Sequence, residues 1–158
     1  MIRNLAALLL AVAVIASPLA RAQDAASGVT DLSALRTALQ GDKKAFVAAT
    51  MGLSDAEAKK FWPIYTDFQR DLDAANRQRS LALEGVIALN KPMSDLFARN
   101  LARDLIAADD AEARARKSMQ NRMLKALPAT KAVRYVQLES KIRAAYAYDL
   151  AAAIPLVK

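Results

Sequence analysis

Residues 53–72, which read LSDAEAKKFWPIYTDFQRDL, decide the fold. Ser54 and Glu57 have the spacing of a capping box, in which each side chain accepts a hydrogen bond from the backbone amide of the other residue. Apolar side chains then follow at spacings of four, three and four, so they share one stripe of a helix. We therefore predict a long helix that begins at Asp55 and supplies the core. The stripe consists of Phe61, Tyr65, Phe68 and Leu72.

We expect this stripe and its surroundings to form the structural hub of the protein. Trp62 would either join the core or stay partly exposed as a binding platform. Pro63 has no amide hydrogen and its ring crowds the carbonyl of Lys59, which predicts a kink rather than a break, because the stripe continues in register. The expected hub residues are Ser54, Glu57, Phe61, Trp62, Pro63, Tyr65, Phe68, Tyr135 and Glu139.

Length and composition predict a single all-α domain. The chain has 158 residues, of which 54% are hydrophobic, only 6% are aromatic and only 4 are glycine. Its apolar content is therefore mostly alanine and leucine, which favour helices. The sequence contains neither cysteine nor histidine, which removes the thiolate, the imidazole base and the commonest zinc ligands from any functional site.

The N-terminus predicts export. Residues 1–22 have the pattern of a signal peptide, with Arg3 before an apolar run over residues 5–16 and a small-x-small cleavage site that ends at Ala22. The run of about a dozen residues is short of the ~20 that span a bilayer. We expect cleavage after Ala22 and a periplasmic mature protein.

Two short helices are predicted between the signal peptide and residue 53. Thr30 or Asp31 can cap the first of them, and Gly41 is placed to end it. Asp42 can cap the second, and residues 50–52 would link it to the long helix. The expected organisation is a leader with short helices over residues 23–52 and a helical domain over residues 53–158.

A second long helix should follow the first. The helix from Asp55 is expected to reach about residue 89, and residues 90–93 form a turn before Ser94 or Asp95, which can cap a helix that extends to about Leu127. Two helices of similar length joined by a short turn predict an antiparallel hairpin. The apolar stripe of the second helix is Phe97, Leu101, Leu105, Ala108, Ala115, Met119 and Met123.

A third helix is predicted to begin near Pro128, which is acceptable at a helix start. An apolar tail, Ile154-Pro155-Leu156-Val157, follows it, and we expect this tail to pack back on the body near Trp62, because an exposed apolar tail would be a liability. The expected stripe of the third helix is Val133, Val136, Leu138, Ile142, Ala145, Tyr146 and Leu150, flanked by Tyr135 and Tyr148.

These motifs resemble the Spy/CpxP-like periplasmic proteins, whose hallmark is a repeated Leu-Thr-x-x-Gln element. The first element corresponds to residues 53–57, LSDAE, while the second, LPATK at residues 127–131, keeps only the leucine. The sequence is most similar to an uncharacterised branch of this superfamily that carries Phe-Trp-Pro-x-Tyr, here residues 61–65, and Tyr-x-Gln-Leu-Glu, here residues 135–139. The resemblance covers most of residues 53–150.

The resemblance implies an ATP-independent chaperone that binds unfolded clients on a basic and apolar concave face, as a thin and curved helical homodimer. The charge agrees, because the signal peptide removes only Arg3 and Arg21 from 23 basic residues and leaves 16 acidic ones. A basic exported protein favours acidic polypeptides, or peripheral contact with an anionic membrane surface, over nucleic acid. The candidate client-binding residues are Arg77, Arg79, Arg99, Arg103, Arg114, Arg116, Lys117 and Arg122.

Other functions remain open at this point. The superfamily includes metal-resistance proteins, and Met119 and Met123 could hold a soft ion such as Cu(I), although two thioethers at this spacing more often pack in a core. An adaptor that docks on a membrane-bound regulator would need the same amphipathic surface as a chaperone. We expect no enzyme, metal or cofactor: Asp109 and Asp110 point about 100° apart on a helix, and no phosphate-binding loop or nucleophile elbow occurs.

Overall fold

The computed structural model describes residues 31–89, 91–154 and 156, and these form five helices and no strand. The chain is therefore all-α in this part. The predicted signal peptide and leader lie outside the described residues. The helices are α2 (Leu32–Gln40), α3 (Lys43–Met51), α4 (Asp55–Ile87), α5 (Asp95–Ala126) and α6 (Ala129–Ala153).

Of the two caps predicted for the first short helix, the structure uses Asp31, and Asp42 caps the second as predicted. The Asp31 carboxylate accepts from the amides of Ser33 and Ala34 at 2.7 and 3.0 Å, and Asp42 accepts from Ala45 at 3.0 Å. Helix α3 runs two residues further than expected, to Met51, so only Gly52 of the expected link at residues 50–52 lies outside the helix. Gly52 ends α3 with φ of 52°, a left-handed conformation that glycine adopts without steric cost.

Helix α4 contains both halves of the predicted capping box. The amide of Ser54 donates to the Glu57 carboxylate at 2.8 Å, and the amide of Glu57 donates to the Ser54 hydroxyl at 3.4 Å. These hydrogen bonds lower the pKa of Glu57, the one from the Ser54 amide most. The helix passes through Pro63 without a break, and Pro63 and Lys59 are both exposed, so the missing backbone hydrogen bond falls on the solvent side.

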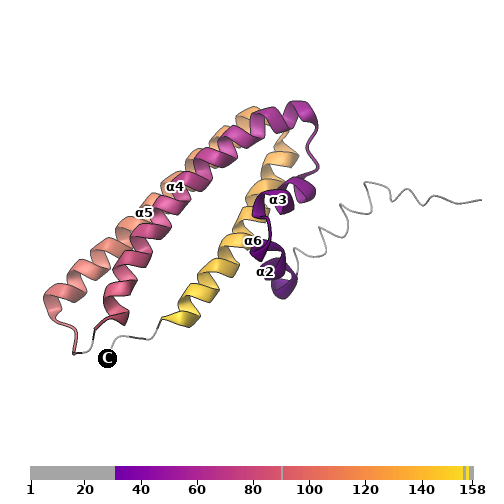
Figure 1. Ribbon diagram of the computed structural model, residues 1–158. Coiled ribbons are helices and arrows are strands. Elements are labelled where there is room, and N and C mark those ends of the chain that lie inside the picture. The colour runs from indigo at the N-terminus through magenta and orange to yellow at the C-terminus, as the bar shows by residue number, and fades with distance from the viewer. Residues whose placement is uncertain (1–30, 90, 155, 157–158) are drawn as a thin grey trace, which may run out of the picture.

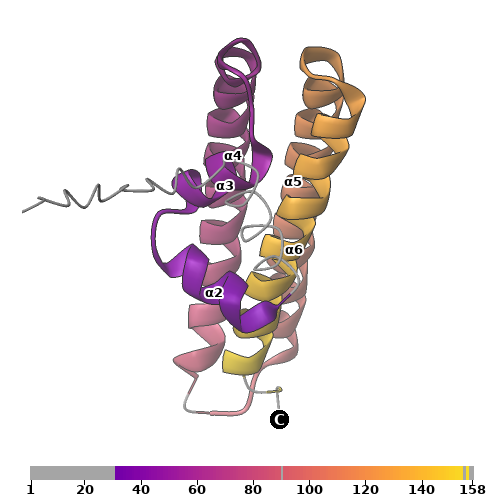
Figure 2. The same cartoon turned by 90° about the vertical axis from the view of Figure 1, so that its right-hand side faces the viewer.

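Helices α4 and α5 form the predicted antiparallel hairpin and lie side by side in Figures 1 and 2. Each is about 50 Å long at 1.5 Å per residue. Gly85 allows Phe97 to approach α4, because a Cβ there would lie 3.2 Å from Cζ of the Phe97 ring. Three ion pairs cross the hairpin: Arg79 pairs with both Asp109 and Glu112 at 2.8 Å, and Arg122 pairs with Asp67 at 2.9 Å.

Helix α6 turns back along the hairpin from the end where α4 begins and α5 ends, and it diverges from the hairpin toward its own C-terminus (Figure 1). Helices α2 and α3 pack against α6, and Figure 2 shows them on the same side of the hairpin as α6. The side chain of Arg36 on α2 forms an ion pair with Asp149, and the Lys131 ammonium donates to the carbonyl of Met51 at 3.2 Å.

The core lies at the end of the hairpin that α3 and α6 cover. All five helices contribute to it, from Leu35 on α2 and Met51 on α3 to Ala145 on α6. Among the described residues from 76 to 107, none is buried. The predicted stripe residues Phe97, Leu101 and Leu105 are accordingly only half-buried, while Ala108, Ala115, Met119 and Met123 are buried.

The predicted stripe of α6 is partly wrong. Val133 and Tyr146 are 49% and 42% exposed, whereas Tyr135, which we placed at the flank, is completely buried. The buried residues Ala132, Tyr135, Leu138, Ile142 and Ala145 follow a spacing of three, three, four and three, so the face that meets the core includes Tyr135 and not Val133 or Tyr146.

The predicted position of the C-terminal tail is also wrong where the structure describes it. Leu156 is 93% exposed, and Ile154 is half-buried beside Arg79 and Asp109 rather than near Trp62. The reason is geometric: α6 has 25 residues and carries the tail about 37 Å from the end of the molecule that holds Trp62. Pro155 and Val157 lie outside the described residues. Among those that are described, no helix is both long enough and apolar enough to cross a membrane.

Candidate functional site

The aromatic members of the expected hub meet in a cluster between α4 and α6, whereas Ser54 and Pro63 of that hub are exposed. The Phe61 ring packs edge-on against Tyr135 with ring centroids 4.9 Å apart, and it stacks on Tyr65 at 5.8 Å. Phe68 is buried in the same core. Trp62 is half-buried against this core, and Lys44 lies 5.0 Å from its ring centroid as a cation–π partner. The cluster is therefore packing rather than an open binding platform.

Glu139 is a buried carboxylate beside this cluster. Its side chain is 5% exposed, it accepts a hydrogen bond from the Tyr135 hydroxyl at 3.3 Å, and the Lys43 ammonium lies 3.7 Å away. Burial raises the pKa of Glu139 because one distant ammonium compensates its charge only in part. Burial, together with the negative charge of Glu139, also raises the pKa of Tyr65 to about 12.

Glu112 is a second buried carboxylate, in a network that ties three helices together. Its side chain is 8% exposed and accepts from Arg79 on α4 at 2.8 Å and from Arg143 on α6. Burial alone would raise the pKa of Glu112, but the hydrogen bonds from Arg143 and Arg79 outweigh burial and lower it. Arg79, whose side chain is 13% exposed, is therefore part of the internal network rather than of an open surface.

Four of the eight candidate basic residues share one exposed stripe along α5. Arg99, Arg103, Arg114 and Lys117 are all exposed, and 100° per residue places them opposite the buried face of the helix. Exposed aliphatic side chains lie on the same line, with Leu96 at 70%, Ile106 at 61% and Leu124 at 53% exposure. We call this surface the outer stripe of α5. Its members are Leu96, Arg99, Arg103, Ile106, Asp110, Arg114, Lys117, Asn121 and Leu124.

The other candidate basic residues lie elsewhere. Arg122 forms an ion pair with Asp67 across the hairpin, and Arg116 is half-buried where α5 faces α6. Arg77 is exposed on α4. The structure therefore brings together half of the predicted set and separates the rest.

The charges on the outer stripe are largely uncompensated. Among the described residues, Arg114 and Lys117 form no ion pair, and Arg99 pairs only with Asp95 one turn away, both exposed. An exposed pair of this kind is worth less than about 1 kcal/mol and is easily exchanged for another partner. The aliphatic members of the stripe were missed by sequence reasoning, which followed the buried face. Their positions opposite the buried face, counted at 100° per residue, were the signal that could have found them.

No metal site is evident in the part of the chain that the structure describes, because no three acidic side chains cluster at ligand distance there. Met119 and Met123 are 2% and 0% exposed and pack in the core. A soft ion could reach their sulfur atoms only if the core opened.

Comparison with known proteins identifies no relative of this chain. No protein-family model matches the chain, and no curated protein or solved structure is significantly similar to it. The resemblance to Spy/CpxP-like proteins accordingly stays a prediction from the quoted motifs.

Proposed function

We propose that this protein is a non-enzymatic binding protein of the bacterial periplasm that holds unfolded, acidic polypeptide clients without ATP, in a chaperone-like role. The observation that carries the proposal is the outer stripe of α5. It combines four basic side chains with three large exposed aliphatic ones along about 42 Å of one helix.

The two kinds of side chain serve different steps. Arginine and lysine attract acidic segments over a distance that salt shortens, about 8 to 10 Å at physiological ionic strength. Leu96, Ile106 and Leu124 then offer apolar contact only at separated points, so no client segment buries a large continuous area. Weak contacts of this kind permit release without a nucleotide.

The open half of the hairpin supports the same proposal. Leu81 and Ile87 on α4 are 69% and 65% exposed, close to the turn that leads to Leu96. Scattered exposed leucines are normal, but a helical arm that lacks a buried residue and carries several large exposed ones is typical of an interaction surface.

The test is suppression of aggregation of a chemically unfolded acidic client, followed by light scattering without ATP at molar ratios from sub-stoichiometric to twofold excess. We expect protection near equimolar protein, weaker at high salt. The stripe variant Arg99→Glu, Arg103→Glu, Arg114→Glu, Lys117→Glu should lose it.

The matched control changes the same charge elsewhere. Lys59, Lys60, Arg134 and Lys141 are exposed, lie outside the stripe and form no ion pair among the described residues. Their fourfold change to Glu should leave protection intact. Equal loss in both variants would remove the stripe from the proposal. A complete lack of protection by the wild type would leave an adaptor for a membrane-bound regulator as the better explanation.

Export is tested separately. Fractionation of the native host followed by N-terminal sequencing should find the protein in the periplasm with Gln23 as its first residue. A cytoplasmic protein that retains Met1 would contradict the proposed location.

A further inference from the structure

The four basic side chains on the outer stripe of α5 occur as two pairs with a gap between them. The pairs are Arg99 with Arg103 and Arg114 with Lys117. At 1.5 Å per residue, the centres of the two pairs lie about 22 Å apart along the helix. At 100° per residue, the four positions fall within about 60° of one another, so both pairs face the same side. Helix α5 is unbroken from Asp95 to Ala126, so it holds this separation fixed.

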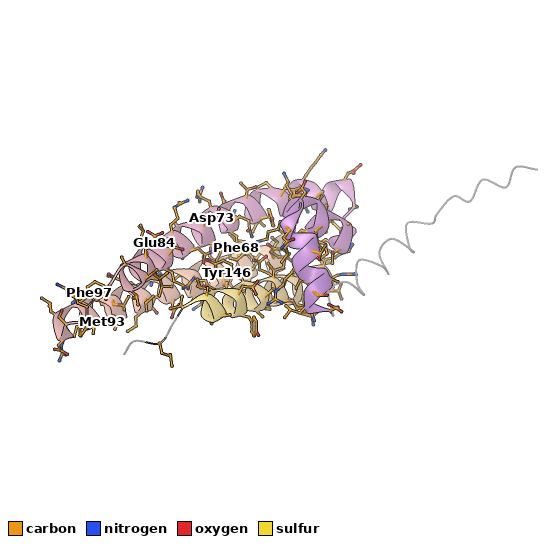
Figure 3. The ribbon with its side chains drawn as sticks, turned by 60° about the horizontal axis from the view of Figure 1, so that its bottom comes forward. Phe68, Asp73, Glu84, Met93, Phe97 and Tyr146 are labelled. Atoms are coloured by element: carbon orange, nitrogen blue, oxygen red, sulfur yellow. The ribbon has the colours of Figure 1, made fainter. Side chains whose placement is uncertain are left out.

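The inner side of α5 is set by Phe97, which Figure 3 labels near the turn of the hairpin. Phe97 is half-buried, and its ring approaches α4 at Gly85. Arg99 follows two residues later, about 200° round the helix, and is exposed. The two basic pairs therefore face away from the rest of the hairpin, where one client segment can reach both.

Among the described residues, one carboxylate lies in the gap on this side of the helix. Asp110 is exposed and forms no ion pair in the described part of the chain, whereas its neighbour Asp109 pairs with Arg79 at 2.8 Å. Along the axis, Asp110 lies about 10 Å from Arg103 and about 6 Å from Arg114. The Debye length at physiological ionic strength is about 8 to 10 Å, so both cations are partly screened at this point. A client carboxylate placed directly over Asp110 is therefore repelled.

The gap also offers an apolar contact. Ile106 is 61% exposed and lies one turn before Asp110 on the same side of α5. An aliphatic client side chain that packs on Ile106 removes apolar surface from water, which is favourable by about 25 cal/mol per Å². The two ends of the stripe thus suit acidic residues, and the gap suits neutral and partly apolar ones.

We propose that the outer stripe selects client segments whose acidic residues form two clusters, with a neutral and partly apolar stretch between them. This inference deepens the proposed function and rests on it. In an extended chain, which advances about 3.3 Å per residue, about six or seven residues span the distance between the two basic pairs. Two weak contacts on one chain reinforce each other only when both can form at once. An uninterrupted acidic run can reach both pairs only by placing carboxylates over Asp110.

The experiment compares two fluorescently labelled peptides of identical composition by anisotropy with the mature chain. Each contains four glutamates and one leucine among serines. In the split peptide the glutamates form two pairs centred about seven residues apart with the leucine between them. In the block peptide the four glutamates are contiguous. We expect the split peptide to bind at least fivefold more tightly at low salt.

The outcomes separate this inference from the proposed function. Equal binding of both peptides, lost in the fourfold glutamate variant of the stripe, would overturn the selection of spacing and leave the proposed function standing. Tighter binding of the block peptide would overturn the selection as well. Absence of binding by both peptides would overturn the selection and the stripe together.

Two variants with the same change in net charge test the role of Asp110. Asp110→Asn should tighten binding of the block peptide at least threefold and leave that of the split peptide nearly unchanged. Asp104→Asn is the matched control, because Asp104 is exposed on α5, forms no ion pair among the described residues and lies about 120° round the helix from Asp110. It should leave the ratio of the two affinities at the wild-type value. The same ratio in both variants would contradict the assignment of Asp110.

Discussion

The two halves of the α4–α5 hairpin have similar helical patterns but different surroundings. In the covered half, residues 61–75 and 108–126, the apolar stripes meet α3 and α6, and Phe61 and Met123 are completely buried. In the open half, residues 76–107, the same stripes meet only each other, and no described residue is buried. The covering helices, together with an aromatic stripe on α4 that ends at Leu72, decide which half becomes a core.

The difference has a consequence for function. Two helices alone cannot enclose a side chain, so apolar residues of the open half keep contact with water and remain available to a partner. The buried network around Glu112 lies at the boundary between the halves, where Arg79 and Arg143 meet its carboxylate. The protein thus joins a packed end to an exposed arm.

The largest expected effect on stability is the difference between alanine substitutions at Phe68 and at Leu81. Phe68→Ala should lower the free energy of unfolding by about 3 to 5 kcal/mol, because it empties a buried site. Leu81→Ala, at a side chain that is 69% exposed, should change it by less than about 0.5 kcal/mol. Urea unfolding followed by the fluorescence of Trp62 measures both. An unchanged midpoint for Phe68→Ala would show that the covered half is not the core.

The next largest effect on stability is expected in the network around Glu112, at the boundary between the two halves. Glu112→Gln should cost about 2 to 3 kcal/mol, because it leaves buried Arg79 without its better partner while Asp109 still pairs with it. Asp109→Asn should cost less than about 1 kcal/mol, since the Asp109 side chain is 73% exposed. The same urea titration compares them, and equal costs would mean that burial of the carboxylate is not what matters.

Local features of this fold could be predicted from the sequence. Capping by Asp31, Asp42, Ser54 and Ser94, the hairpin and its turn all depend on residues within a few positions of one another, so a linear pattern contains them. The buried face of α6 could not be predicted in the same way, because a helical stripe can start from either Val133 or Tyr135. Only the position of α4 in the structure shows that the stripe from Tyr135 to Ala145 is the one that packs in the core.

The candidate site could be predicted only in part. Exposure of Arg114 and Lys117 follows from the helix period once the buried face is known. Burial of Glu112 and Glu139 could not be predicted from the helix period. Carboxylates rarely lie inside a protein, and the basic side chains that pair with these two come from other helices. The position of the tail at Leu156 depends on the length and on the direction of α6. The sequence predicts the length of this helix but not its direction.

Acidification should distinguish the two buried carboxylates. Burial raises the pKa of Glu139 above its ordinary value of 4.5, so the folded protein holds a proton that the unfolded chain has released, and stability increases as pH falls from neutral toward 4.5. Glu139→Gln cannot ionise. We expect it to be more stable than the wild type at pH 7, with a difference that shrinks on acidification.

The stability contribution of Glu112 should change with pH in the opposite direction to that of Glu139. Because its folded pKa is lowered, its contribution is present above 4.5 and is lost as pH falls through the lowered value. Thermal unfolding of the wild type, Glu139→Gln and Glu112→Gln separates the two: Glu139→Gln is compared from neutral pH down to 4.5, and Glu112→Gln is compared below 4.5, where its pH window lies. A Glu139→Gln advantage that grows on acidification would contradict the assignment.

The smallest effect compares the two serine caps. Ser54→Ala and Ser94→Ala each remove a side chain that accepts from the amide three residues later, at 3.4 and 3.3 Å, a change that costs a helix about 1 kcal/mol. Ser54 starts α4 next to the packed end, so its loss should lower the global free energy of unfolding by about that amount. Ser94 starts α5 in the open arm, which can open without the core. Ser94→Ala should therefore leave the global value nearly unchanged and speed hydrogen exchange only in the first turns of α5. If it lowers global stability as much as Ser54→Ala, the arm folds as one unit with the core, and the two halves differ in exposure alone.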